Sequence, residues 1–377
     1  MNDHNNELLT RSQSNHLRKT NQKKRRRKRI RRFILLVFTL AIVLSGLYVW
    51  YLVAQSKSAI DQSYQPTSKD IQNPKTTDDF NGEKSFSMLL LGTDTGAEGR
   101  EELNGNSDTI MVATVNPKTQ KTTLTSIPRD TMAEMVSSKN FNIQKINAAY
   151  NIGGADMALS SASELLNIPI NYYMTINMGG LEQVIDAVGG VDVDVPFDFS
   201  YGWTNFKKGK MHLTGHGALD YTRMRYDDPE GDYGRQKRQR QVIEAILKNA
   251  ISFNSLQNFQ SILNSVSKNI RTNVTFDDMI SIFMHYRSSA NQIESDYLHG
   301  MSAYIGGASY QVMSTDELQR VSDKLRSEVS LPTEKIKNNE TRQNQLNTSF
   351  SFEDYTTDQT YYLYSKNNDN LLWDGAN

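Results

Sequence analysis

Residues 33–53, FILLVFTLAIVLSGLYVWYLV, form an apolar or neutral stretch without a single charged side chain. A helix of this length, at about 1.5 Å per residue, crosses a hydrocarbon core of about 30 Å. Tyr48, Trp50 and Tyr51 gather at its C-terminal end, as aromatic residues do at membrane interfaces. The stretch therefore predicts one transmembrane helix.

The segment before this helix is strongly basic and sets its orientation. Residues 1–32 hold 12 basic and 2 acidic side chains, and the run KKRRRKRIRR directly precedes the apolar stretch. The positive-inside rule keeps this segment cytoplasmic, next to anionic membrane lipids. The sequence thus predicts a single-pass type II protein of the cell membrane, with everything after residue 53 extracellular.

Three other interpretations compete with this anchor. A cleaved signal peptide usually has a shorter apolar core and a small-residue cleavage site, to which YLVAQS (51–56) is a poor match. A buried core helix is disfavoured because the stretch has no polar face. A basic arm can bind nucleic acid, but beside a membrane span it more often meets lipid head groups.

The charge of the rest of the chain limits its partners. The whole sequence has 42 basic and 42 acidic residues, so the part after residue 32 carries a net charge of about −10. Such a body does not attract nucleic acid over its whole surface, and any anion must be bound by a local cluster. The absence of cysteine excludes disulfides and thiolate metal sites.

Composition divides the exported part into three segments. Residues 54–84 are polar and predict an extracellular tether, residues 85–331 alternate strand-like and helix-like patterns, and residues 332–377 predict a mostly disordered polar tail. Strand patterns occur at 86–94 and 109–130, and helical patterns at 153–168 and 234–251. We expect an α/β fold: one α/β/α sandwich domain around a central mixed sheet, preceded by the transmembrane helix.

The stretch YTRMRYDDPEGDYGRQKRQRQ, residues 221–241, concentrates arginine. In a helix over 234–251, Arg235 and Gln239 share the face of Val242 and Ile246 and so point inward. Lys237 and Arg240 fall on the opposite face, which predicts that they are solvated, and Arg238 lies at the border.

An inward guanidinium needs a carboxylate or an anionic ligand, because a buried unpaired charge is costly. Arg223 and Arg225, two residues apart, fit an extended segment or a frayed helix end in which both share one face. Together with Arg235 near a helix N-terminus they would bind phosphate oxygens. The competing interpretation is a set of structural salt bridges to Asp227, Asp228 or Asp232.

Three charged residues upstream also sit at predicted strand ends. Asp94 ends LLLGTD, Asp108 opens the next strand in NSDTIM, and Arg129 follows a strand in SIPRD. Ligand sites of α/β sheets favour such loops, and two carboxylates favour Mg²⁺ bound together with phosphate oxygens. For each aspartate alone, a turn or helix-capping role is the simpler explanation.

Six segments in the same order resemble the LytR–CpsA–Psr family of Gram-positive bacteria over about residues 85–331. They are LLLGTD, SDTIMVATVNPKTQKTTLTSIPRD, KINAAYNIGG, GGVDVDVP, LTGHGALDYTRMRY and DYGRQKRQRQ. The resemblance implies a phosphotransferase. Such proteins move an anionic glycopolymer, wall teichoic acid or capsular polysaccharide, from an undecaprenyl pyrophosphate carrier to peptidoglycan through a phosphodiester bond.

The resemblance also implies roles for individual residues. The pyrophosphate would be held by Arg129, Arg223, Arg225, Arg235 and Gln239. Asp94 and Asp108 would support Mg²⁺ or act as the base, which makes them, with Arg129, the catalytic candidates. The prenyl chain would occupy an apolar cavity between the sheet and helices.

Two other functions remain open at this point. A pyrophosphatase would use the same residues with water in place of the sugar hydroxyl. A non-enzymatic membrane-bound regulator or attenuator would bind the lipid or polymer without needing a pair of metal-binding carboxylates.

Overall fold

A computed structural model describes residues 63–72, 77–95, 105–252, 262–263, 267–354, 357–367 and 369–373. All of these residues belong to one compact unit, Lys57–Asn377. Among them, no helix combines the length and the apolar character needed to cross a membrane. The basic segment 1–32 and the predicted span 33–53 lie outside the described residues, so the membrane anchor stays a prediction.

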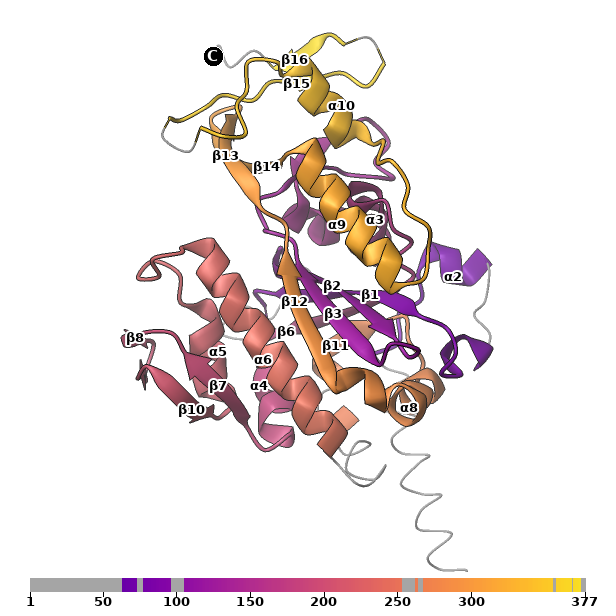
Figure 1. The fold of residues 1–377 in the computed structure, drawn as a ribbon, viewed down its shortest axis with the longest axis vertical. Coiled ribbons are helices and arrows are strands. Elements are labelled where there is room, and N and C mark those ends of the chain that lie inside the picture. The colour runs from indigo at the N-terminus through magenta and orange to yellow at the C-terminus, as the bar shows by residue number, and fades with distance from the viewer. Residues whose placement is uncertain are drawn as a thin grey trace, which may run out of the picture. The chain divides into compact units, whose positions relative to one another are not determined.

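A mixed six-stranded sheet forms the centre of the fold (Figure 1). Its spatial order is β11 (Ile270–Thr272), β6 (Tyr172–Asn177), β1 (Phe86–Thr93), β2 (Ser107–Asn116), β3 (Lys121–Ser126) and β12 (Gln292–Tyr297). β1 pairs in parallel with β6 and antiparallel with β2, and β3 pairs in parallel with β12. The predicted hairpin over 109–130 is confirmed as β2 and β3.

Helices cover both faces of this sheet because side chains alternate along its strands. Leu89 and Leu91 of β1 pack in a core with α3 (Ala149–Leu166) and α9 (Thr315–Glu328). Leu90, between them, borders residues of α4 (Met178–Ala187) and α6 (Asp232–Ser252). The mixed α/β class predicted from the sequence is confirmed.

A smaller layer packs outside α6 on the second face. Its members are α5 (Gly215–Arg223), β7 (Val191–Val195), β8 (Phe199–Tyr201), β9 (Thr204–Phe206) and β10 (Gly209–Leu213). Tyr221 of α5 and Phe206 of β9 share a buried cluster with Val242 of α6. This cluster fixes where α5 ends relative to the start of α6, which matters for the site.

The remaining described elements lie around the sheet and at its ends. They are α2 (Ser68–Gln72), η1 (Thr77–Phe80), β4 (Met132–Glu134), β5 (Ile143–Lys145), η2 (Ile146–Ala148), η3 (Ser267–Asn269), α8 (Phe276–His285), η4 (Arg287–Ala290), β13 (Gly300–Ile305), β14 (Ala308–Met313), α10 (Asn339–Leu346), β15 (Leu363–Tyr364) and β16 (Leu371–Trp373). β13 and β14 form a hairpin whose turn contains Gly306 and Gly307, both with positive φ. Two successive positive φ angles suit glycine and the tight turns that join antiparallel strands.

The predicted tether is partly folded onto the domain. Phe80 is buried against Phe86 and Tyr172 in an aromatic cluster. The carboxylate of Asp70, also buried, accepts a hydrogen bond of 2.8 Å from Asn273 Nδ2. Residues 63–72 and 77–84 of the predicted tether 54–84 therefore pack on the domain and do not extend away from it, because the Phe80 ring and the Asp70 carboxylate find buried partners.

The expectation of a mostly disordered tail over 332–377 is also wrong for the tail residues that the structure describes. Phe350 and Tyr361 are buried against Met301 and Val312 of the β13–β14 hairpin. Amide side chains bond to backbone groups of the tail. Asn347 Nδ2 donates to Tyr362 O, and Asn347 Oδ1 accepts from Tyr362 N, each at 2.8 Å. Polar composition therefore does not mean disorder here, because these amides satisfy buried backbone groups.

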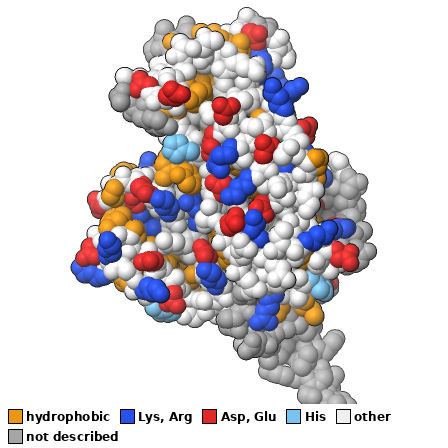
Figure 2. Space-filling model, in the orientation of Figure 1, with side chains coloured by type: hydrophobic (Ala, Val, Ile, Leu, Met, Phe, Trp, Pro, Cys, Tyr) orange, Lys and Arg blue, Asp and Glu red, His pale blue; other side chains and the backbone are white. Residues whose placement is uncertain are grey.

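The surface shown in Figure 2 carries lysine and arginine side chains interspersed with acidic ones. They do not gather into one broad basic patch on this face. This distribution agrees with the expectation that the chain binds an anion only where cations converge locally.

Candidate functional site

Three strand ends bring the acidic residues and the first arginine together. Thr93 at the end of β1 pairs with Ser107 at the start of β2, so Asp94 and Asp108 follow at the same edge. Because β2 and β3 are antiparallel, β3 ends beside the start of β2, and Arg129 comes three residues after that end. Sheet topology alone thus places three charged side chains at one end of the sheet.

Gly92, near the end of β1, lines the space above this end of the sheet. A Cβ atom at this position would lie 2.9 Å from Cβ of Thr109 on β2, closer than real side chains approach. The register of β1 and β2 also shifts between Gly92 and Thr93. A glycine here keeps the two strands close and leaves space above them open.

The other arginines come from the junction of α5 and α6. Arg223 is the last residue of α5, and Met224 caps the helix with an extended ψ of 134°, so Arg225 follows outside the helix. α6 begins at Asp232, and Arg235 and Gln239 lie one turn apart on it. The structure confirms the predicted helix end, the inward phase of these two residues and their burial.

All seven residues predicted from the sequence line one cavity of about 320 Å³, which we call the basic pocket. They are Asp94, Asp108, Arg129, Arg223, Arg225, Arg235 and Gln239. Four guanidiniums and two carboxylates meet there, in a body that is otherwise acidic. The geometry favours an anionic ligand with several oxygen atoms.

Ion pairs hold these charges in place. Arg129 Nη1 lies 2.8 Å from Asp108 Oδ1, and Arg235 Nη2 lies 2.6 Å from Asp232 Oδ1. Arg225 Nε is 3.8 Å from the same Asp232 oxygen. The sequence interpretation that acids between the arginines pair with them is confirmed for Asp232.

Burial and neighbouring charge act in opposite ways on two of the arginines. Burial disfavours the charged form of Arg129, but the hydrogen bond and charge of Asp108 outweigh it and raise the pKa. Burial lowers the pKa of Arg235; Asp232 opposes this, while Arg129 and Arg225 add to it. Arg235 Nε is buried without a hydrogen-bond partner among the described residues. The basic pocket therefore has positive charge in excess of its carboxylates near Arg235, which an anionic ligand would compensate.

A second, apolar cavity of about 210 Å³ lies between the sheet and the helices α4 and α6. Leu90 and Met111 of the sheet face Val184 of α4 and Ile243 of α6 across it. Residues that line both this apolar cavity and the basic pocket are Gly92, Thr109, Ile176, Leu181, Thr222 and Gln239. An amphiphile with an anionic head and an apolar chain would fit the two together.

Comparison with known proteins agrees with this geometry. Residues 47–327 match the LytR_cpsA_psr family. The chain belongs to this family. A polyisoprenyl-teichoic acid–peptidoglycan teichoic acid transferase TagU of Enterococcus faecalis is 43% identical over 297 residues, which cover 79% of this chain and 95% of that protein.

Solved structures of family members also share the fold. Bacillus subtilis TagU is 35% identical, with a TM-score of 0.53 over 65% of this chain and 97% of that chain. A structure described as TagT bound to LIIa-WTA is 27% identical, with a TM-score of 0.59 over 71% of this chain and 100% of that chain. The matched family segment ends at residue 327, before the tail that packs on β13 and β14.

Two arginines of this LytR_cpsA_psr domain differ from expectation. Arg240 was expected to be solvated, but it is buried, donates from Nη1 to Ser126 Oγ at 2.7 Å, and lies over the ring of Tyr297. Arg238, expected at a border, is only 1% exposed and pairs with Asp228. Both are buried because α6 is covered on two sides, by the sheet and by α5. The prediction from helical periodicity allowed for only one buried side.

Other residues that line the basic pocket escaped the sequence analysis. Asn177 ends β6 and caps α4 by accepting a hydrogen bond of 2.8 Å from Gly180 N. Its position could have been inferred, because β6 runs parallel to β1 and ends at the same edge. Tyr201 ends β8 and Tyr226 lies in the turn after α5, and no local sequence pattern predicts that either lines the pocket.

No group of three or more metal-ligating side chains occurs among the described residues. Asp94 and Asp108 are the two carboxylates of the basic pocket. This donor set fits Mg²⁺, which is commonly held by one or two carboxylates together with substrate phosphates. It does not fit a cation that needs a complete protein cage.

Proposed function

We propose that this chain is a phosphotransferase that attaches a lipid-linked anionic glycopolymer, wall teichoic acid or capsular polysaccharide, to peptidoglycan. The observation that carries the proposal is the continuity between the basic pocket and the apolar cavity. One holds four arginines and the other is lined almost entirely by apolar side chains, as a polyprenyl pyrophosphate requires. The transferase names of its relatives support the same reaction.

The donor would bind with its undecaprenyl chain between the sheet and α6 and its pyrophosphate among Arg129, Arg223, Arg225 and Arg235. Arginine suits this task, because its planar fork pairs bidentately with phosphate oxygens. Gln239, which lines both cavities, would mark the junction of head and chain.

In the reaction, a peptidoglycan sugar hydroxyl attacks the phosphorus that bears the glycopolymer. The new P–O bond forms the phosphodiester, and the bond to the bridging oxygen breaks, so that the lipid leaves as its monophosphate. Asp94 or Asp108 would accept the hydroxyl proton, and the arginines stabilise the charge on the phosphoryl oxygens. Mg²⁺ held by these aspartates and the phosphates would supply further charge neutralisation.

A membrane anchor suits a lipid substrate. We propose that residues 33–53 span the cell membrane, with the basic segment 1–32 cytoplasmic and the catalytic domain extracellular. The anchor would hold the basic pocket near the plane in which the donor lipid diffuses.

A transfer assay tests this function. The full chain in detergent micelles is incubated with a polyprenyl-pyrophosphate-linked saccharide, Mg²⁺ and peptidoglycan fragments, and mass spectrometry detects a covalent phosphodiester. Arg129→Ala should lower the transfer rate about 100-fold or more, the loss seen when one charge-stabilising donor is removed. Asp94→Ala should lower it by about 100-fold or more as well, the contribution of a general base.

Three results would count against the proposal in different ways. Transfer that survives both substitutions contradicts the site. Free phosphosaccharide without linkage to the acceptor indicates a hydrolase. Donor binding without any turnover indicates a non-enzymatic regulator.

A further inference from the structure

A third cavity, a polar groove of about 480 Å³, has lining residues distinct from those of the basic pocket and the apolar cavity. Its walls are the outer face of the β13–β14 hairpin, the aromatic residues Tyr233 and His299, and the tail residues Asp354, Thr357 and Asp358. Figure 2 shows the surface hollowed between the region of this hairpin and tail and the region of α5 and α6. We call this feature the polar groove.

Strand alternation gives the hairpin wall its chemistry. Met301 and Ala303 face the core, whereas Ser302 and Tyr304 are exposed on the other side. Gln311 lies opposite Ser302 in the register and donates from Nε2 to its hydroxyl at 2.8 Å. The hydroxyl of Ser302, the amide of Gln311 and the ring of Tyr304 thus lie on one face of the hairpin. Tyr304 is 43% exposed.

The floor of the polar groove is an aromatic shelf. The rings of Tyr233 and His299 stack with centroids 5.1 Å apart and an interplanar angle of 13°. The Tyr233 hydroxyl accepts a hydrogen bond of 2.9 Å from Gly300 N and lies 3.2 Å from Gln311 Oε1. Burial raises the pKa of Tyr233 to about 12, even further above neutral pH than that of an ordinary tyrosine, so this hydroxyl is protonated.

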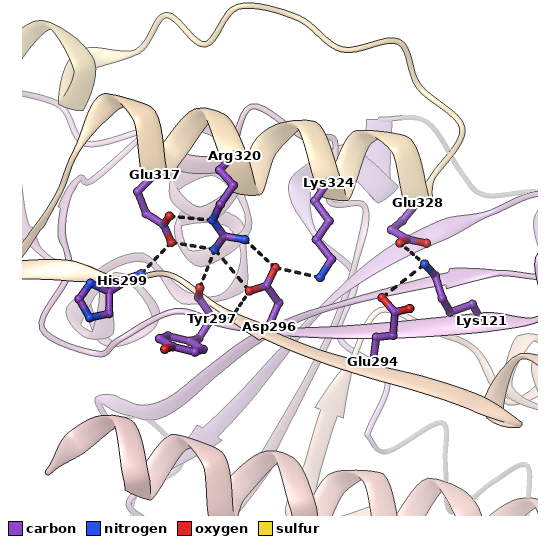
Figure 3. A network of polar contacts seen from close by, with 9 residues as sticks. All are labelled: Lys121, Glu294, Asp296, Tyr297, His299, Glu317, Arg320, Lys324 and Glu328. Atoms are coloured by element: carbon purple, nitrogen blue, oxygen red, sulfur yellow. Dashed lines mark hydrogen bonds and ion pairs between the residues drawn. The ribbon is translucent and has the colours of Figure 1, made fainter. Parts of the chain in front are cut away.

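A network of ion pairs fixes the shelf from behind (Figure 3). Glu317 Oε1 accepts a hydrogen bond of 2.9 Å from His299 N, and Arg320 donates to Tyr297 O at 3.0 Å. Arg320 also pairs with Glu317 at 2.7 Å and with Asp296 at 3.1 Å. The backbone at 297–299 is therefore tied to α9, and the groove is preformed.

The polar groove and the basic pocket have no lining residue in common, but neighbouring residues on two elements connect them. Tyr233 precedes Arg235 by two residues on the first turn of α6. On the other side, Gln311 N donates to Asp130 O at 2.9 Å, and Asp130 directly follows Arg129. A chain lying in the groove would reach the edge of the phosphate site.

We propose that the polar groove binds the neutral N-acetylated glycan chain of the acceptor, an inference that rests on the proposed transferase function. No lysine or arginine is among its described lining residues, and Asp354 and Asp358 make it acidic. A phosphate-rich donor polymer would be repelled. Sugar hydroxyls pair with amides, hydroxyls and carboxylates, and apolar sugar faces pack on exposed aromatic rings.

The tail contributes one wall of this site. Asp354, Thr357 and Asp358 lie beyond residue 327, where the match to the family ends. The tail would thus adapt the family's fold to a particular acceptor.

Binding of two probes to the full chain in detergent micelles tests the proposal. An N-acetylglucosamine tetrasaccharide represents the neutral glycan, and a glycerol phosphate oligomer represents the anionic polymer. Tyr304→Ala and His299→Ala should weaken tetrasaccharide binding about tenfold, or about 1.4 kcal/mol. Tyr64→Ala, which removes a ring of similar exposure (36%) away from the groove, should leave it unchanged. Binding of polyprenyl pyrophosphate should be equal in all four proteins.

Each other result has a distinct meaning. If the tetrasaccharide binds equally to Tyr304→Ala, His299→Ala and Tyr64→Ala, or not at all, while polyprenyl pyrophosphate binds, the groove assignment is wrong and the transferase proposal stands. Competition by the glycerol phosphate oligomer would assign the groove to the donor polymer instead. If the wild-type chain fails to bind polyprenyl pyrophosphate, the proposed function fails, and the acceptor assignment fails with it.

Discussion

Replacing Arg238 by methionine should destabilise the protein and loosen the basic pocket. Arg238 is 1% exposed, donates from Nε to Tyr221 O at 2.9 Å, and pairs with Asp228 and with Met224 O. These partners lie at the end of α5 and in the turn after it, next to Arg223 and Arg225 of the basic pocket. Arg238→Met keeps much of the volume but leaves the Asp228 carboxylate buried and unpaired. Removing one partner of a buried ion pair costs about 3–5 kcal/mol.

A double-mutant cycle separates the lost charge pair from the lost packing. Urea unfolding of Arg238→Met, Asp228→Asn and the double variant gives the three free energies. The double variant should be more stable than Arg238→Met by about 1–3 kcal/mol, because no unpaired charge remains. Lys237→Met, on the exposed side of the same helix, should change stability by less than about 0.5 kcal/mol.

The functional consequence can be measured separately. Without Arg238, residues 223–228 lose the hydrogen bonds that hold them in place. The Kd for polyprenyl pyrophosphate should therefore rise in Arg238→Met, even in conditions where the variant is fully folded. Additive effects in the cycle, together with an unchanged Kd, would show that this ion pair does not position the basic pocket.

Two further predictions concern the tail and the apolar cavity. Burial raises the pKa of Glu340 to about 7, because the folded state favours its protonated form. The contribution of Glu340 to the free energy of unfolding is therefore fully present below its unfolded pKa of about 4.5. It should be lost as the pH rises through 7, a decrease of about 3 kcal/mol. In urea unfolding across this range Glu340→Gln should flatten the dependence, whereas Glu353→Gln on the exposed surface should not; equal curves would contradict the assigned burial. Ile243→Trp should fill part of the apolar cavity and weaken binding of a long-chain polyprenyl pyrophosphate, but not of a short-chain analogue, in a binding titration. Equal weakening of both would show that the chain lies elsewhere.

Local pattern and sheet topology predicted most of the residues that line the basic pocket. Asp94 and Arg129 follow apolar strands and Asp108 opens one, and antiparallel pairing of consecutive strands brings these strand ends together. Arg235 and Gln239 share a helix face with apolar residues, so their inward direction follows from a period of 3.6. These inferences need no knowledge of distant contacts.

Distant contacts decided what the sequence analysis missed. The burial of Arg240 depends on Ser126 and Tyr297, which are far away in the chain and invisible to helical phase. The folded tail depends on amides such as Asn347 that bond to the backbone of another segment. Such polar partners are indistinguishable in sequence from solvated residues until the fold brings them together.

The place where polyprenyl pyrophosphate binds distinguishes the proposed site from any other. A crystal structure of the complex should place phosphate oxygens within about 3 Å of guanidinium nitrogens of Arg223, Arg225 and Arg129. The prenyl chain should lie in the apolar cavity, between Leu90 of the sheet and Ile243 of α6. A pyrophosphate bound away from these arginines, or a prenyl chain outside that cavity, would show that the donor binds elsewhere.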